Sequence, residues 1–180
     1  LTTGDGGAVV CKDRGAADRI RRLAWFGMRR KPVGPERWPS DQNVPEAGFK
    51  MHMNGIAAAL GLAGLDGLDA ALEACRANAA CYNAIIGTEK AYTSGAAPWT
   101  YTVFAEDPAH FVAYMAEHGV AAGQPHRRND ANDFNRPSGA RLPNTDWAQA
   151  HYCSIPVGWW LTEDDVNRIC ALIRAYGGMI

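Results

Sequence analysis

The longest regular pattern of apolar residues along the chain lies between positions 54 and 86. Apolar residues recur at helical spacing, first as Ile56, Ala59, Leu60 and Ala63, and then as Leu62, Leu65, Leu68, Leu72, Cys75 and Ala79. Asn54 stands where its side-chain oxygen can accept from the N–H of Ile56 or Ala57 and cap the helix. We therefore predict a long helix from Asn54 to about Ile86, with a bend or a close helix contact at Gly64 and Gly67.

Residues 99–180 alternate between short β-type segments and helical segments. The expected strands are 99–104, 120–122 and 151–155, and residues 131–147 are expected to be irregular. One helix begins after Asp107-Pro108 and ends at Gly119, and the last helix opens at Thr162, which pairs with Asp165 as in a capping box. This order predicts a small α+β domain, in which helices cover one face of a short sheet.

Residues 1–53 predict one strand and one helix without a sheet of their own. The apolar run 8–11 is typical of a buried strand, and residues 16–26 form an amphipathic helix that ends at Gly27. Because Val9 and Val10 alone cannot bury a face, we expect a larger α/β sheet upstream of Leu1 to complete this part. Residues 31–45 carry four prolines and are predicted to be a loop.

Composition narrows the class of protein. The chain has 180 residues, 47% of them hydrophobic and 21% charged, with a net charge of −1, so a folded protein without a nucleic-acid surface is expected. No apolar run is long enough to span a membrane. The five cysteines include no CxxC pair and predict buried free thiols in a reducing, cytoplasmic compartment. The arginine-rich residues 19–31 are interpreted as the solvated face of a helix.

Two places are candidates for binding chemistry. Residues 49–53 precede the positive end of the long helix, where phosphate prefers to lie, although a plain loop before a packed helix explains the same pattern. His126, Arg128 and Asp130 would share one side of an extended segment, and Arg128 could grip a carboxylate or phosphate. The alternative is that Arg128 and Asp130 simply pair on the surface. The five histidines have no metal-ligand spacing, and we expect no metal.

Five segments, in the same order along the chain, resemble the DegT family of pyridoxal-phosphate-dependent sugar aminotransferases. They are LTTGDGGAVV at 1–10, RLAWFGMRR at 22–30, the segment 48–62 that begins with Gly48-Phe49-Lys50, the His-x-Arg-Asn-Asp element at 126–130, and SIPVGWWLTEDD at 154–165. The resemblance implies fold type I, with a large sheet domain, a small C-terminal α+β domain and a homodimer. It implies transfer of an amino group from an amino-acid donor, usually glutamate, to a keto-sugar nucleotide.

The resemblance also implies roles for particular positions. The family's cofactor-binding lysine would fall just before Leu1, so no catalytic residue is assigned, and the chain alone is expected to be inactive. Lys50 stands where many relatives have an asparagine that reaches the phosphate of pyridoxal 5'-phosphate in the neighbouring subunit. His126 and Arg128 match the element that lines the sugar side. Residues 1–53 would be the tail of the large domain, and residues 54–180 the connecting helix and small domain.

Two other functions remain open from the sequence. One is a non-catalytic fragment or interaction module that keeps the small domain and the dimer surface. The other is a small phosphate- or nucleotide-binding module, based on the glycines at 4–7 and the helix start at Asn54. The glycine-containing segments contain neither GxGxxG nor GxxxxGK[ST], which makes that module the weaker alternative.

Overall fold

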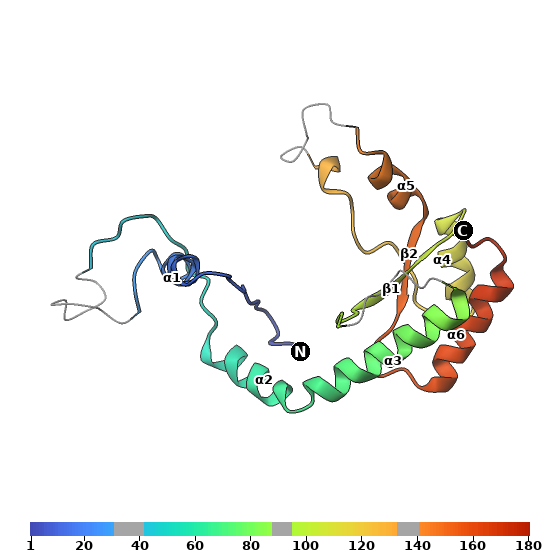
Figure 1. Ribbon diagram of the computed structural model, residues 1–180, viewed down its shortest axis with the longest axis horizontal. Helices are drawn as coiled ribbons and strands as arrows, with labels where there is room; N and C mark the ends of the chain where they lie inside the picture. Colours follow the sequence, from blue (N-terminus) through green and yellow to red (C-terminus); the bar gives the residue numbers. More distant parts are fainter. Residues whose placement is uncertain (31–41, 88–94, 133–140) are drawn as a thin grey trace. The chain divides into compact units, whose positions relative to one another are not determined.

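The computed structural model describes residues 1–30, 42–87, 95–132 and 141–180 (Figure 1). These residues divide into two compact units, Leu1–Leu68 and Asp69–Ile180. Within them lie six α-helices, one short 3-10 helix and a two-stranded antiparallel sheet. Most of the predicted loops at 31–45 and 87–98 lie outside the described residues. The mixed α+β class expected from the sequence is confirmed.

The first unit contains two helices, α1 (Arg14–Leu23) and α2 (Gly55–Leu65). Helix α1 begins at Asp13, whose carboxylate accepts from the Ala16 N–H at 2.8 Å, and α2 begins at Asn54, whose side chain accepts from the Ala57 N–H at 2.9 Å. The predicted cap at Asn54 is therefore confirmed. The helix predicted over 16–26 starts two residues earlier and ends at Leu23.

The strand predicted at 8–11 is wrong. Residues 8–11 have no regular structure, and the side chains of Val9 and Val10 are 69% and 96% exposed. A strand needs a neighbouring strand for its backbone hydrogen bonds, and the described residues offer none at this place. The exposure expected for these two valines in the absence of a partner sheet is thus observed.

The single long helix predicted from 54 to 86 is divided in two. Helix α2 ends at Leu65, and α3 (Leu68–Ile86) begins after Asp66 and Gly67. The division falls at one of the two glycines that the sequence marked as an interruption, since glycine costs roughly 1 kcal/mol in a helix interior. Among the described residues no single helix is long and apolar enough to cross a membrane; α2 and α3 together meet that test of length and composition, as core helices of globular proteins also do.

The second unit is built on strands β1 (Thr100–Phe104) and β2 (Tyr152–Pro156). The strands pair antiparallel, with Tyr101 opposite Ile155 and Val103 opposite Cys153. Of the predicted strands, 99–104 and 151–155 are confirmed within one residue. The strand predicted at 120–122 is wrong, because these residues form no strand. The neighbouring Gly123 contacts β2 through a single isolated bridge to Ser154.

One face of this sheet packs against helices α3, α4 (Pro108–Glu117) and α6 (Glu163–Tyr176) (Figure 1). The core holds the inward side chains of both strands and of these helices: Tyr82, Tyr101, Val103, Phe111, Met115, Cys153, Ile155, Val166, Ile169, Cys170 and Ile173. The caps predicted for α4 and α6 are confirmed, since Asp107 accepts from the His110 N–H at 3.0 Å and Thr162 forms a capping box with Asp165.

The other face of the sheet meets helix α5 (Pro143–His151), where the sequence predicted irregular structure. Trp147 of α5 lies against Phe104 of β1, with ring centroids 5.0 Å apart. Pro143 in the first turn favours the helix start, but Leu142 before it makes no side-chain cap, so the usual start signal was absent. Helix α5 therefore forms one wall of a depression over this open sheet face.

Candidate functional site

The first candidate site lies in the Leu1–Leu68 unit, where the end of α1 pairs with the segment 48–52. The Phe49 N–H donates to the Leu23 carbonyl at 2.7 Å, the Phe26 N–H to the Phe49 carbonyl at 2.9 Å, and the Met51 N–H to the Ala24 carbonyl at 3.0 Å. Trp25 and Lys50 face each other in an isolated antiparallel bridge. This pairing holds the Trp25 turn against residues 49–52.

Gly27, Gly48 and the strained residue Phe26 allow this close pairing, and an added Cβ at Gly48 would lie 2.1 Å from the Gly27 nitrogen. Gly27 has φ +80°, and an added Cβ would lie 2.2 Å from the Glu46 carbonyl oxygen. Phe26 has φ 55°, the one positive value for a non-glycine among the described residues. A bulky side chain in this region costs of order 1–3 kcal/mol, so the backbone bonds to Phe49 must hold it there. The turn is thus specified by its partner segment and not by local preference.

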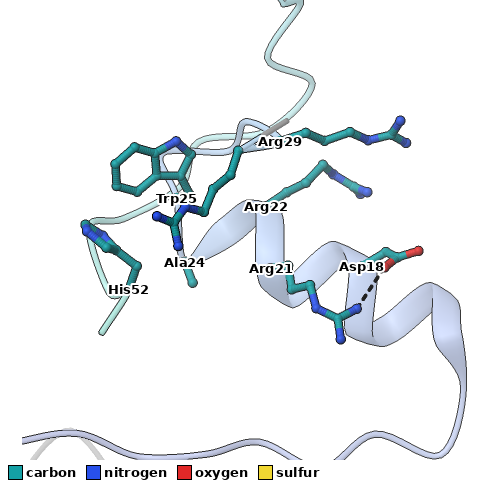
Figure 2. A pocket seen from close by; sticks show the side chains of 8 residues that line it. Asp18, Arg21, Arg22, Ala24, Trp25, Arg29 and His52 are labelled. Atoms are coloured by element: carbon teal, nitrogen blue, oxygen red, sulfur yellow. Dashed lines mark hydrogen bonds and ion pairs between the residues drawn. The ribbon is translucent and has the colours of Figure 1, made fainter. Parts of the chain in front are cut away.

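The pairing forms an open pocket of about 580 Å³. Its lining comprises Asp18, Arg21, Arg22 and Ala24 from the α1 region, Trp25, Arg29 and Arg30 from the turn, and His52 from the facing segment. Figure 2 shows the side chains of Arg21, Arg22, Trp25 and Arg29 extending from α1 and the turn after it, and His52 on the facing segment. Arg21 pairs with Asp18 and Arg22 lies 3.8 Å from a Glu46 oxygen, so the positive charge in excess comes from Arg29 and Arg30, although the whole chain carries a net charge of −1.

Polar groups in this pocket are incompletely paired. Three buried side-chain nitrogens in the described part of the chain lack a hydrogen-bond partner: Arg22 Nε, Trp25 Nε1 and His52 Nδ1. All three belong to residues that line this pocket. The Arg21 guanidinium pairs with Asp18 at 2.9 Å, and the Arg30 guanidinium lies 5.4 Å from the centre of the Trp25 ring. The sequence interpretation took these arginines as a solvated helix face and placed His52 in a separate candidate segment, 49–53, so it did not bring the arginines and His52 together in one pocket.

The second candidate site is the depression over the open face of the β1–β2 sheet. Its floor carries the hydroxyls of Thr100, Thr102 and Ser154, and its walls come from residues 125–129 and from α5. His126 and Arg128 both line it, so the structure brings these two predicted residues together. Asp130 does not line the depression, because residues 129–131 turn as a 3-10 helix where the sequence suggested extended backbone.

Arg128 is held by two carboxylates. Its Nε donates to Asp130 at 2.7 Å, a second nitrogen pairs with the same carboxylate, and the third pairs with Asp146 of α5. The guanidinium keeps the pKa of Asp130 below its usual value, and the two carboxylates raise the pKa of Arg128. The pairing of Arg128 with Asp130 is the alternative that the sequence left open, and Asp146 is a partner that it did not suggest.

His126 is fixed mainly through its backbone. The Tyr152 hydroxyl donates to the His126 carbonyl at 2.6 Å and accepts from the His126 N–H at 3.0 Å. The imidazole lies beside Trp99, with ring centroids 5.6 Å apart. Tyr152 is a positioning residue that the sequence could have suggested only through its place at the start of β2. Among the described residues no group of three or more histidine, cysteine or acidic side chains could hold a metal ion.

Comparison with known proteins gives these two sites a context. Residues 1–174 match the DegT/DnrJ/EryC1/StrS aminotransferase family. The chain belongs to this family.

Solved structures of full-length relatives agree. Sugar aminotransferase CalS13 from Micromonospora echinospora superimposes with a TM-score of 0.84 at 34% identity, over 97% of this chain and 48% of that one. AtS13 from Actinomadura melliaura gives 0.82 at 32% identity, with the same two coverages. PseC from Helicobacter pylori, at 18% identity and a TM-score of 0.79, shows the fold alone. The chain thus spans about half the length of these relatives and matches the C-terminal part of a fold type I aminotransferase.

Lys50 is the residue that motif resemblance alone predicts to contact the cofactor. The bridge to Trp25 presents Lys50 on the extended segment 48–52, and its side chain is exposed. No ion pair joins Lys50 to another residue in the described ranges, so its charge is not neutralised there. A lysine in this setting fits a phosphate group as a point charge.

Proposed function

We propose that these residues form the C-terminal half of a pyridoxal-phosphate-dependent aminotransferase that moves an amino group from glutamate to a keto-sugar nucleotide. The observation that carries the proposal is the family match over residues 1–174, together with the 34% identity to a sugar aminotransferase along 97% of the chain. We further propose that residues 1–53 belong to the cofactor-binding domain and residues 54–180 to the connecting helix and small domain.

In this proposal Lys50 would hold the phosphate of pyridoxal 5'-phosphate bound in the neighbouring subunit. When bound, this cofactor supplies the carbonyl group that carries the amino group between donor and acceptor. Relatives that have asparagine at this position would use a neutral donor, whereas Lys50 would contribute a full positive charge. The role of Lys50 would therefore be electrostatic and should fade with added salt.

His126 and Arg128 would face the sugar. Because Arg128 is paired with both Asp130 and Asp146, this cluster carries one more negative than positive charge. The two carboxylates engage the Arg128 guanidinium, and the threonine and serine hydroxyls on the floor of the depression suit the hydroxyl groups of a sugar. The sheet depression is therefore the proposed site of the sugar.

A homodimer is part of the proposal. The first unit exposes many large apolar side chains, among them Val9, Val10, Ile56, Leu60 and Leu62. Exposure on this scale is typical of a surface that another chain or domain covers. The five cysteines are unpaired, which suits the reducing cytoplasm that we propose as the location. Sedimentation of the protein encoded by the whole reading frame is expected to give a dimer, and a monomer would contradict this part.

The activity can be tested on the protein encoded by the whole reading frame, which we expect to continue in frame upstream of Leu1 into a lysine-containing segment. Incubation with pyridoxal phosphate, glutamate and a keto-sugar nucleotide should release 2-oxoglutarate and yield the amino sugar. Lys50→Asn should retain cofactor affinity within a few-fold, whereas Lys50→Glu should lose about tenfold or more. Absence of 2-oxoglutarate with every keto-sugar nucleotide tried would refute the function.

The coverage of only 48% of the matched structures favours a second candidate, a non-catalytic fragment or interaction module. It predicts that the 180-residue chain alone takes up no cofactor covalently. Borohydride reduction in the presence of pyridoxal phosphate, followed by mass spectrometry, distinguishes the two when the protein encoded by the whole reading frame is compared with this chain: a stable adduct on the former supports the aminotransferase, an unmodified mass for both supports the module, and an adduct on the chain alone contradicts the module.

A further inference from the structure

The arginine pocket of the first unit has a charge pattern that the fold alone does not explain. Arginines in the last turn of a helix favourably meet its negative end, and this accounts for Arg21 and Arg22 in α1. It does not account for Arg29 and Arg30, which lie beyond the turn and still line the same pocket. Neither Arg29 nor Arg30 forms an ion pair with a carboxylate in the described ranges.

Hydrogen bonding in the pocket points to the kind of ligand that is missing. The unpartnered nitrogens of Arg22 and Trp25 are obligate donors, and neither can serve as an acceptor. Buried donors are costly to leave unpaired, and native proteins rarely do so without a functional reason. An oxyanion that entered the pocket, with the arginine side chains reorienting around it, would supply acceptors for these groups and balance the positive charge.

Phosphate matches this set of donors better than a single carboxylate. Arg21 and Arg22 have carboxylate partners in Asp18 and Glu46, whereas Arg29 and Arg30 bring two further positive charges to a space of about 580 Å³. A single carboxylate carries one negative charge, but a phosphate or diphosphate offers several oxygens and more than one negative charge. The Trp25 ring forms one wall of the pocket: the Arg30 guanidinium lies over it at 5.4 Å from the ring centre, and the His52 ring stands at 85° to it with ring centroids 4.3 Å apart.

We propose that this pocket binds the phosphate groups of a phosphorylated ligand, and that in the assembled enzyme these are the diphosphate of the sugar nucleotide. The second clause rests on the function proposed above. The competing source of the same chemistry is the phosphate of pyridoxal phosphate, because the bridge to Lys50 brings the proposed cofactor contact beside the pocket.

Calorimetric titration of the full chain with inorganic phosphate, a nucleoside diphosphate and pyridoxal phosphate tests the pocket. The Arg29→Gln/Arg30→Gln double variant should bind the nucleoside diphosphate about tenfold more weakly or worse. Arg14→Gln/Arg141→Gln is the matched control, because it removes the same charge from two exposed arginines that do not line the pocket, and it should change affinity less than about twofold. Far-UV circular dichroism checks that each variant is folded.

Trp25→Phe provides an independent variant, since it keeps an aromatic ring but removes the unpartnered N–H donor. It should weaken phosphate binding several-fold, and added salt should weaken binding in the wild type more than in the double-arginine variant. If the arginine variant weakens only pyridoxal phosphate, the pocket holds the cofactor phosphate and not the diphosphate. The proposal would be overturned if none of the three ligands bound at about 1 mM, or if the Arg29→Gln/Arg30→Gln and Trp25→Phe variants bound them as tightly as wild type.

The outcomes also separate this inference from the proposed function. A protein from the whole reading frame that transaminates while the arginine variant retains its affinity for the nucleotide would refute the pocket and leave the aminotransferase in place. Phosphate binding that depends on Arg29 and Arg30, in a protein that releases no 2-oxoglutarate, would uphold the pocket and refute the enzyme.

Discussion

Gly48 offers the sharpest test of how the first unit is built. A Cβ at this position would lie 2.1 Å from the Gly27 nitrogen, 2.7 Å from the Phe26 carbonyl carbon and 2.8 Å from the Leu23 oxygen. All three are backbone atoms, so no side-chain rotation can relieve the contact. Gly48→Ala should therefore push residues 48–52 away from the end of α1, since ordinary contacts begin at 3.4 Å.

The cost follows from the hydrogen bonds that the displacement breaks. Three backbone bonds join the two segments, with the N–H groups of Phe26, Phe49 and Met51 as donors. At a net contribution of about 1 kcal/mol each, their loss amounts to about 3 kcal/mol of local stability. That free energy corresponds to about a hundredfold faster hydrogen exchange at these three amides. The arginine pocket would open with the pairing, because its two walls are the segments that separate.

Hydrogen–deuterium exchange of wild type and Gly48→Ala measures this directly. Gly55→Ala is the matched control, because no atom lies within 4 Å of a Cβ at that helix start and alanine is the better helix former by up to about 1 kcal/mol. The control should exchange as wild type does or more slowly. Unchanged protection of the three amides in Gly48→Ala would show that the segments can separate slightly without losing their hydrogen bonds. That result would contradict the predicted loss of pairing.

Other predictions concern the second unit. Tyr82→Phe should lower its free energy of unfolding by about 1–2 kcal/mol in urea titrations, because the buried hydroxyl donates at 2.9 Å to the carbonyl that ends β2; no change would mean that water replaces the donor. Hydrogen bonds from Thr162 lower the pKa of Asp165, so their stabilising effect is complete above the unfolded pKa of about 3.9 and is lost as pH falls through the lowered folded pKa. Thr162→Ala should lower the free energy of unfolding by about 1 kcal/mol at neutral pH. It should also make the melting temperature fall less steeply as pH drops below 4, and an unchanged pH dependence would contradict this. A thiol reagent at pH 8 should modify exposed Cys81 well before Cys153, whose pKa burial raises to about 11; equal rates would contradict the burial.

Many of the elements in both units could be predicted from the sequence, because helix starts are set by contacts between near neighbours. The helix starts at Asn54, Asp107 and Thr162 depend on bonds to a residue three positions away, and all three form as predicted. Strand β1 follows from its β-branched and aromatic residues. Helix α5 was not predicted because Leu142 gives no side-chain cap. Since Asp146 lies on α5, its ion pair with Arg128 was not predicted either.

The candidate sites show where local information ends. The sequence by itself determined which charged and aromatic residues are available, and motif resemblance pointed to Lys50, His126 and Arg128. Only the tertiary structure placed Trp25 against Lys50 and His52, because that contact joins segments more than twenty positions apart through backbone bonds that no local pattern encodes. The failed strand at 8–11 has the same cause: a helix satisfies its own backbone, whereas a strand exists only when another segment of chain completes its hydrogen bonds.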